Sequence, residues 1–247
     1  MLSLIKSKIY SSILYLGALY HKDQHSKVIY YHDIHDESNA KYTEMSTDFN
    51  LFKVHIQCIK EMRFEIVKDI TQPEKQLKIS FDDGFRGVYH HKDYFVQNQI
   101  FPTIYIITSL VGEKDYLTWE ELRELDSLGF NLQSHTHFHS DLNKLDKKNL
   151  FDDLKKSKNL LEKNLNREIT ELCFPKGLFN NQVLEVAKEV GYTKCYCSIP
   201  GNSEDHKELE ILYYRNLVQF SSKRDFKSIL LGGMLLFKNR YKKQHYA

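Results

Sequence analysis

Two short segments of the chain carry side chains that could bind a metal ion and activate water. The first, Ser80–Gly84, has the sequence SFDDG and places two adjacent carboxylates directly after a short apolar run. The second, His135–His139, has the sequence HTHFH and places imidazoles four residues apart. One carboxylate and two imidazoles are a sufficient ligand set for a zinc-like divalent ion with an open position for water. A second carboxylate would serve as a base, so the pattern indicates metal-assisted hydrolysis.

The two adjacent carboxylates are expected to have different roles. Like charges repel at this distance, which raises the pKa of one carboxyl group unless a cation relieves the repulsion. Asp83, next to Gly84, is the better ligand candidate and leaves Asp82 as the base. The alternative is a structural turn in which the Asp side chains accept hydrogen bonds from the backbone before Gly84.

The histidines of the second segment are also predicted to have different roles, with two of them facing the metal site and one pointing away from it. His135 and His139 lie on one side of a helical turn if the segment is helical, as positions i and i+4 do. His137 would then point elsewhere. The alternative is a polar loop that is rich in histidine, but the presence of Asp82 and Asp83 after another strand favours a shared site.

Both segments follow predicted strands. Apolar, β-rich runs alternate with helical patterns, which predicts a mainly parallel sheet, open or closed into a barrel. The carboxyl ends of such strands meet at one mouth, where active sites form. The predicted strands are Val28–Tyr31, Leu77–Phe81, Thr103–Ile107, Phe130–Gln133, Glu171–Phe174, Lys194–Cys197 and Leu212–Val218. The predicted helices are 48–62, one that begins at a capping box at Thr118 and stops near Gly129, 145–165 and 181–190.

Composition narrows the class of protein. The 247 residues fit one large domain, and the 41% hydrophobic and 13% aromatic content is enough for a packed core. The formal net charge is only +2, and the basic residues are spread among acidic ones. The sequence therefore shows no basic patch of the kind that binds nucleic acid. The four cysteines contain no C-x-x-C pair and are predicted to be reduced core thiols.

The two termini carry apolar runs with basic neighbours. Ile9–Tyr20 is too short to span a bilayer. It is predicted to be an amphipathic helix that packs on the domain or on a membrane surface, with a weak signal peptide or anchor as the alternative. Ile229–Phe237 is flanked by lysine and arginine and is predicted to be a packed helix, or else an attachment to anionic lipid. These segments divide the chain into residues 1–26, 27–220 and 221–247.

With both motifs in this order, the chain resembles the polysaccharide deacetylases, the NodB-homology domain of carbohydrate esterase family four. The family's first motif, [ST]-F-D-D-G, is matched by Ser80–Gly84, and its second, H-[ST]-x-x-H, by His135–His139. A third motif, a proline-x-glycine loop, is matched by Pro175–Gly177. The resemblance covers roughly Val28 to Val218. It implies an α/β fold, a distorted (β/α) barrel and not a doubly wound sheet.

The resemblance also implies roles for individual residues. Asp82 would be the general base, and the backbone N–H of Lys176, next to Pro175, would help to hold the oxyanion. The implied metal ligands are Asp83, His135 and His139. Zinc is the default ion, although such sites also accept cobalt or nickel.

Two positions depart from the family's common pattern. Many members have an arginine where this chain has Cys173, and we predict that Arg215 replaces it near Asp82, grouped with Lys176 and Pro175 around the substrate. Many members also take the general acid from a late L-x-H motif, whereas Leu212–Asn216 has no histidine.

An upstream histidine offers a substitute for the missing acid. A branch typified by poly-N-acetylglucosamine deacetylases carries a Y-H segment before the first motif, and that histidine serves as the acid. Tyr31 is followed here by His32, which is therefore the predicted acid. The alternatives are a polar loop without a role, and an arrangement in which Asp33 orients His32.

The leading functional hypothesis is a metal-dependent hydrolase that removes N-acetyl groups from an aminosugar in a polysaccharide or lipid-linked glycan. The alternatives are deformylation or deacylation of a small or lipid-carried sugar, or of another amide, and a carbohydrate-binding pseudo-enzyme. The predicted partner is an N-acetylated carbohydrate and not nucleic acid, with peripheral membrane contact as an open option. The protein is expected to be a monomer in the cytoplasm or at the inner membrane face.

Overall fold

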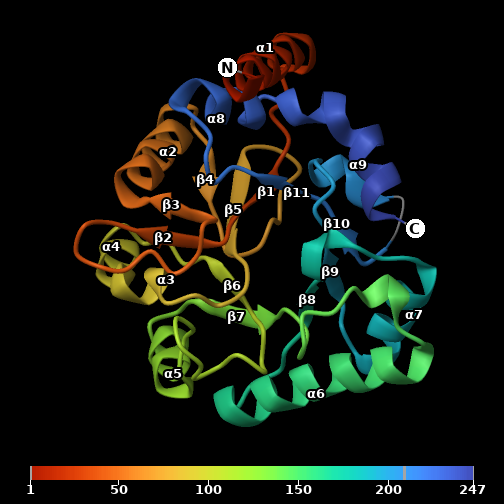
Figure 1. Ribbon diagram of the computed structural model, residues 1–247. Helices are drawn as coiled ribbons and strands as arrows, with labels where there is room; N and C mark the ends of the chain where they lie inside the picture. The colour runs from red at the N-terminus through yellow and green to blue at the C-terminus, as the bar shows by residue number, and fades with distance from the viewer. Residues whose placement is uncertain (1, 208–209, 247) are drawn as a thin grey trace.

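The strands of the protein form a ring that is surrounded by helices (Figure 1). Within residues 2–207 and 210–246, which the computed structural model describes, nine strands belong to one sheet in the order β10-β9-β8-β7-β6-β5-β1-β11, with β4 beside β5. All pairings between these strands are parallel. The strands are β1 Lys27–Tyr31, β4 Glu65–Ile66, β5 Gln76–Phe81, β6 Thr103–Ile106, β7 Asn131–Ser134, β8 Glu171–Cys173, β9 Lys194–Tyr196, β10 Leu212–Tyr213 and β11 Arg215–Leu217; β2 Asp33–His35 and β3 Ser46–Asp48 form a separate parallel pair.

One short segment of chain closes the ring. β10 pairs with β9 and β11 pairs with β1, so the two ends of the sheet are joined through Tyr214. The predicted single strand over Leu212–Val218 is therefore two short strands, because its two halves have different neighbours. This arrangement confirms the α/β fold and the distorted (β/α) barrel.

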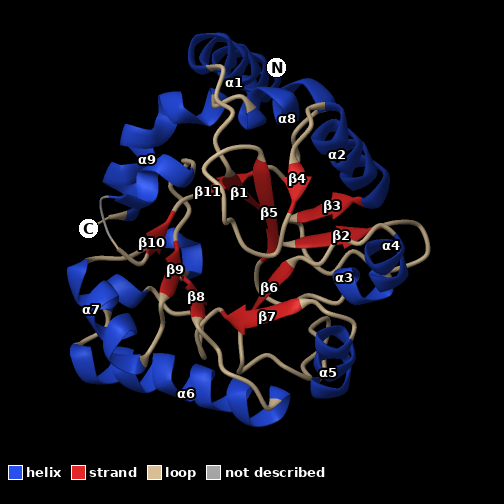
Figure 2. Ribbon diagram, turned by 180° about the vertical axis from the view of Figure 1, so that it is seen from behind, coloured by secondary structure: helices blue, strands red, loops and turns tan. Residues whose placement is uncertain are grey.

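Helices cover the outside of the ring in both views (Figure 2). The predicted helices are confirmed with their caps: Asp48 caps α2, Thr118 forms a capping box with Glu121 on α5, and Gly191 ends α7 in the left-handed conformation. The helices are α1 Leu2–His21, α2 Phe49–Glu61, α3 Gly87–His90, α4 Lys92–Gln97, α5 Trp119–Ser127, α6 Lys147–Leu165, α7 Asn181–Val190, α8 Lys223–Leu230 and α9 Lys238–His245; the 3-10 turns are η1 Leu142–Lys144, η2 Pro175–Gly177, η3 Ser203–Lys207 and η4 Gly233–Phe237.

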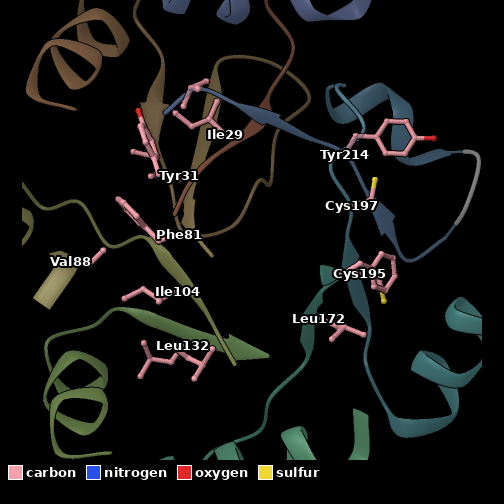
Figure 3. Close-up of a cluster of buried hydrophobic side chains, with 14 of the residues drawn as sticks. Ile29, Tyr31, Phe81, Val88, Ile104, Leu132, Leu172, Cys195, Cys197 and Tyr214 are labelled. Atoms are coloured by element: carbon pink, nitrogen blue, oxygen red, sulfur yellow. The ribbon is translucent and has the colours of Figure 1, made fainter. Parts of the chain in front are cut away.

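Alternation along each strand separates an apolar layer from a polar interior. Successive side chains of a strand point to opposite faces. Side chains such as Ile29, Phe81, Ile104 and Leu132 gather in the main hydrophobic cluster (Figure 3). All four cysteines are buried and unpaired, as the sequence predicts. The hydrophobic layer fixes which residues of each strand remain on the opposite face.

The opposite face of the strands carries a buried polar network. Lys78 Nζ on β5 lies 2.7 Å from Glu171 Oε1 on β8, and Tyr105 on β6 donates a hydrogen bond to Glu171 Oε2 at 3.0 Å. Lys78, Tyr105 and Glu171 are almost fully buried. A buried charge is tolerated when it is paired and hydrogen-bonded in this way.

The two terminal segments pack against each other. Tyr10 Oη on α1 lies 3.0 Å from Met234 Sδ on η4, and Ser11 donates a hydrogen bond to Asp225 on α8. The predicted continuous helix over Ile229–Phe237 is wrong, because Gly232 has φ 87° and separates α8 from η4. In the part of the chain that the structure describes, no helix has the length and apolar character needed to cross a bilayer.

Candidate active site

The two adjacent carboxylates follow β5 in a tight turn. The Asp82 N–H donates to Tyr31 O on the neighbouring strand at 3.0 Å, which extends the ladder by one residue. Asp83 then adopts φ 73° and Gly84 φ 82°, both in the left-handed region. Aspartate tolerates this conformation better than most residues, and glycine adopts it freely. The turn therefore separates the two carboxylates, and each enters a different set of contacts.

The histidine segment after β7 is a loop and not a helical turn, so the predicted helical spacing of its imidazoles is wrong. Thr136 has φ 69° and His139 has φ 57°. The loop is held by side-chain acceptors: the His137 N–H donates to Asp153 Oδ1 at 2.6 Å, and the His139 N–H to Thr136 Oγ1 at 3.0 Å. His137 itself turns away and is bonded to Thr108 through Nδ1.

Asp83, His135 and His139 nevertheless meet at one point. Asp83 Oδ1 lies 3.3 Å from His135 Nε2 and 3.4 Å from His139 Nε2, while this buried oxygen has no hydrogen-bond partner among the residues that the structure describes. Ligands held at metal–ligand bonds of about 2.0–2.1 Å in a tetrahedral site lie about 3.3 Å from each other. These three residues therefore fit a zinc-like divalent ion.

The two imidazoles differ in protonation. Burial alone would lower the pKa of His135, but its contacts with Cys173 and Asp83 outweigh burial and raise that pKa well above its usual value, so a cation would have to displace a proton from His135. His135 Nδ1 lies 2.8 Å from the carbonyl oxygen of Cys173, which can only accept, so Nδ1 carries the hydrogen and Nε2 faces Asp83. Burial lowers the pKa of His139 to about 4, with a smaller contribution from the neighbouring His135. His139 is thus neutral near neutral pH, which is the form that binds a metal.

A second group of potential ligands, Asp82, His135 and Cys173, also lies within 4.8 Å of one another. Its members are already occupied. Asp82 is in an ion pair with Arg215, and Arg215 Nη2 lies 2.9 Å from Cys173 Sγ. Burial raises the pKa of the Cys173 thiol, so the thiolate that a metal requires is disfavoured.

Arg215 forms a two-pronged ion pair with Asp82. Its Nη1 and Nη2 atoms lie 2.6 Å and 2.9 Å from the two carboxylate oxygens. The Arg215 side chain is fully buried, so its predicted position near Asp82 is observed but its grouping with substrate-contacting residues is corrected. Burial alone would raise the pKa of Asp82, but the guanidinium outweighs this effect and holds that pKa at about 2.

His32 follows β1 and is oriented by a residue that the sequence did not single out. His32 Nδ1 lies 2.7 Å from Gln219 Oε1, and Gln219 is 3% exposed. The alternative in which Asp33 orients His32 is wrong. Asp33 packs against α3, where a Cβ on Gly87 would lie 2.2 Å from Asp33 Oδ1.

The motif-three loop completes the surroundings. Lys176 has φ 56°, which is uncommon for a residue with a side chain, and its Nζ pairs with Asp141 at 2.7 Å. Gly177 has φ 70°, and a Cβ there would lie 2.6 Å from Ser198. Pro175 is buried. Only glycine fits this close approach at position 177, so the loop packs against Ser198, two residues after the end of β9.

A cavity of about 440 Å³ joins these parts. It brings together His32, Asp82, Asp83, His135, His139 and Lys176 of the predicted site, whereas Pro175 and Arg215 are not in its lining. The remaining lining residues are Tyr30, Met45, Ser198, Leu217, Tyr241 and His245.

Sequence reasoning missed Gln219, Tyr241 and His245. Gln219 comes two residues after β11, and a search of every strand end for polar residues would have found it. Tyr241 and His245 lie on α9, outside any motif, and stack with ring centroids 5.5 Å apart. No signal in the sequence places them at the cavity, because the fold of the terminal segment decides it.

The fold and the site define a parallel (β/α) barrel with a candidate metal centre of the hydrolytic type. The family model described as polysaccharide deacetylase matches residues 69–195, and the chain belongs to this family. Two curated relatives agree. YxkH of Bacillus subtilis, which carries the name of a polysaccharide deacetylase, is 29% identical over 147 residues, 58% of this chain and 51% of the relative. A poly-beta-1,6-N-acetyl-D-glucosamine N-deacetylase of Staphylococcus aureus is 31% identical over 137 residues, 48% of this chain and 46% of the relative.

Solved structures support the fold. The Streptococcus pyogenes deacetylase PplD in complex with acetate superposes with a TM-score of 0.72 at 20% identity, over 83% of this chain and 98% of that one. In sequence, the chain spans about half the length of the curated relatives it matches.

Proposed function

We propose that the protein is a metal-dependent N-deacetylase that acts on an N-acetylated aminosugar within a glycan. The observation that carries this proposal is the convergence of a carboxylate–imidazole cluster, a second carboxylate and a third imidazole on one cavity. The cluster is Asp83, His135 and His139, and the two other groups are Asp82 and His32. This set contains a candidate for each role that amide hydrolysis needs.

A divalent cation held by Asp83, His135 and His139 would polarise the acetyl carbonyl and acidify the attacking water. Asp82 would take the proton from that water. Its low pKa keeps it ionised throughout the neutral range, and the Arg215 pair fixes its direction. A carboxylate with so low a pKa is a weak base. It can accept the proton of the attacking water only if the pKa of that water is itself lowered.

His32 would return a proton to the departing amine. Because the carboxamide oxygen of Gln219 accepts from Nδ1–H, the other nitrogen, Nε2, is the one that exchanges a proton. The Lys176 backbone N–H would stabilise the developing oxyanion. The close packing of Gly177 on Ser198 holds this loop at the cavity and sustains the unfavourable φ of 56° at Lys176.

The cavity also suits a sugar ring. Tyr241 supplies aromatic surface, and His245 extends the stack on it, whereas Tyr30 lines the cavity from a buried position against Arg215. Aromatic faces pack well against the apolar face of a pyranose, while the polar groups on the opposite side reach its substituents. These features favour an N-acetylated sugar over a plain acyl amide.

Acetate release from N-acetylglucosamine oligomers tests the proposal. The wild-type protein loaded with zinc should release acetate, and the His32→Gln protein should lose about 10²–10⁴-fold in kcat/KM, the usual contribution of a general acid. His35→Gln is the matched control, because His35 bonds to Ser46 and does not line the cavity. Full activity of His32→Gln would overturn the role of His32. No activity of the zinc-bound wild type would favour the carbohydrate-binding pseudo-enzyme.

Replacing Gln219 should act through His32. Gln219→Leu removes the acceptor for Nδ1–H, and we expect kcat to fall on the order of tenfold, the equivalent of one buried hydrogen bond. Gln219→Glu keeps an acceptor and should retain activity, with the alkaline limb of the kcat–pH profile moved to higher pH because the added charge favours imidazolium. An unmoved profile in Gln219→Glu would contradict a positioning role.

A further inference from the structure

Helix α1 turns an apolar face away from the protein. Its inner side packs through Leu14, Gly17 and Ala18, all buried. The large apolar side chains on the other side are exposed, by the following fractions: Ile9 55%, Tyr15 42%, Leu16 60%, Leu19 51% and Tyr20 80%. An ordinary surface helix has the opposite pattern, with polar residues facing solvent.

These five side chains form one stripe. With 3.6 residues per turn, they fall within an arc of roughly 140° around the helix, an arc that also contains the exposed Lys8 and Ser12. The stripe continues into a groove of about 480 Å³ between α1 and α8, lined by residues that include Tyr15, Leu19 and Leu231. Contiguous exposed apolar surface of this kind is uncommon on soluble monomers and marks a contact with a partner or a membrane.

Basic side chains lie within the stripe, at Lys8, and beside it. Lys6 and Lys8 are exposed on α1, and the groove is edged by Lys223, Arg224 and Lys227 of α8. The Arg224 guanidinium lies 4.6 Å from the centre of the Tyr15 ring.

Two acidic residues, one on α2 and one on α8, reduce this positive charge. Glu61 of α2 pairs with Lys223 and Lys227, and Asp225 accepts hydrogen bonds from Ser11 and Ser222. The surroundings of the stripe stay net positive, because the two carboxylates, Glu61 and Asp225, are outnumbered by the basic residues Lys6, Lys8, Lys223, Arg224 and Lys227.

We propose that the α1–α8 face binds the surface of a bilayer that contains anionic lipids, with α1 lying flat in the interface. An apolar stripe bordered by cations matches a hydrocarbon boundary below a layer of negative headgroups, and tyrosines suit that boundary. A second copy of the chain fits less well, because a two-fold contact through this stripe would bring the basic borders together.

Such attachment would hold the barrel and its candidate active site in a fixed orientation relative to the membrane. α1 packs on η4, where a Cβ on Gly17 would lie 2.8 Å from Gly233 O, and η4 continues directly into α9. Tyr241 and His245 of α9 line the cavity described above. The lipid-facing helix is therefore linked to the cavity wall by one rigidly packed segment. The lipid-binding proposal itself does not depend on the proposed enzymatic activity.

Sedimentation of the full chain with vesicles tests the proposal. The protein should bind vesicles of phosphatidylcholine mixed with phosphatidylglycerol and bind vesicles of phosphatidylcholine alone much more weakly. Lys6→Gln with Lys8→Gln should weaken binding to the mixed vesicles by about tenfold or more, since each basic residue near an anionic surface contributes about a factor of five. The matched control is Lys148→Gln with Lys163→Gln on α6, which lies across the molecule from α1 in both views.

A second pair of variants tests the apolar stripe. Leu16→Gln with Leu19→Gln should abolish vesicle binding, whereas Leu16→Ile with Leu19→Ile should retain it. These positions are exposed, so the fold should survive, and an unchanged unfolding transition checks this. Equal binding to both vesicle types, an equal loss in the α6 control, or a dimer in light scattering that Leu16→Gln with Leu19→Gln dissociates would each overturn the proposal.

Discussion

Replacing Asp83 with asparagine is expected to remove the metal ion and to lower kcat/KM for acetate release on the order of 10³-fold or more. The change keeps the size of the side chain but exchanges the charged oxygen for an amide. Asp83 Oδ1 is the atom that lies near both imidazole nitrogens and, within the described part of the chain, lacks a hydrogen-bond partner. Metal content after dialysis, together with the zinc dependence of acetate release, measures the effect.

The Asp83→Asn substitution should leave the backbone conformation of the turn unchanged. Asp83 has φ 73°, a conformation that asparagine tolerates as well as aspartate, so the turn should persist. Asp115→Asn is the matched control, because Asp115 has φ 72° and does not line the cavity. The control should keep its metal and its activity. Wild-type metal affinity in Asp83→Asn would show that the three-residue cluster is not the metal site.

Replacing Arg215 with methionine is expected to lower the free energy of unfolding by about 3–5 kcal/mol at neutral pH. Methionine fills much of the same space, but the Asp82 carboxylate would then be buried without its two-pronged partner. Urea unfolding of metal-free protein measures the loss. Arg123→Met is the matched control: Arg123 forms an exposed pair with Glu120, and such pairs contribute about 0.2–1 kcal/mol.

The pH dependence of this loss follows from the pKa of Asp82. In the wild type that pKa is lowered from 3.8 to about 2, so the ionised carboxylate stabilises the fold above about pH 4. The stabilisation is lost as the pH falls through about 2. In Arg215→Met the guanidinium no longer opposes burial and only the weaker effects of His135 and His32 remain, so the pKa of Asp82 rises and protonation of this carboxyl group relieves the destabilisation of the variant. The stability difference between wild type and variant should therefore begin to shrink above about pH 4, as the pH falls through the raised pKa of Asp82 in the variant, and should go on shrinking down to about pH 2.

A double variant separates charge from shape. Arg215→Met combined with Asp82→Asn removes the unpaired carboxylate, and we expect it to be more stable than Arg215→Met alone. If the double variant were less stable by the sum of the two single effects, Asp82 and Arg215 would not be coupled, and the role assigned to the pair would be wrong.

The sequence by itself determined the chemistry-bearing residues and the class of fold. Strand-forming runs that alternate with helical patterns specify a parallel sheet, and local signals such as the Thr118 capping box and Gly191 specify where helices begin and end. The motifs at Asp82, Asp83, His135 and His139 are short and contiguous, so their spacing is visible without tertiary structure. Their position after strands follows from the same local pattern.

Local pattern did not determine the conformation of the histidine loop. Helical spacing predicts that His135 and His139 share one side of a turn, but they meet through left-handed residues at Thr136 and His139. The loop adopts this shape because Asp153, a buried residue of α6, accepts the His137 N–H. A contact across sixteen residues competes successfully with the local preference.

Only the tertiary structure decided which distant residues serve the motif residues. Arg215 reaches Asp82 because β11 closes the barrel beside β1, and Gln219 reaches His32 because the chain leaves β11 next to the end of β1. Tyr241 and His245 line the cavity because the terminal helices fold back over the barrel. The side of α1 that carries Leu16 and Leu19 faces outward because the opposite side packs on α8 and η4. The sequence specifies the identity of each side chain. The neighbours that set the protonation, orientation and exposure of that side chain are brought to it only when the chain folds and the barrel closes.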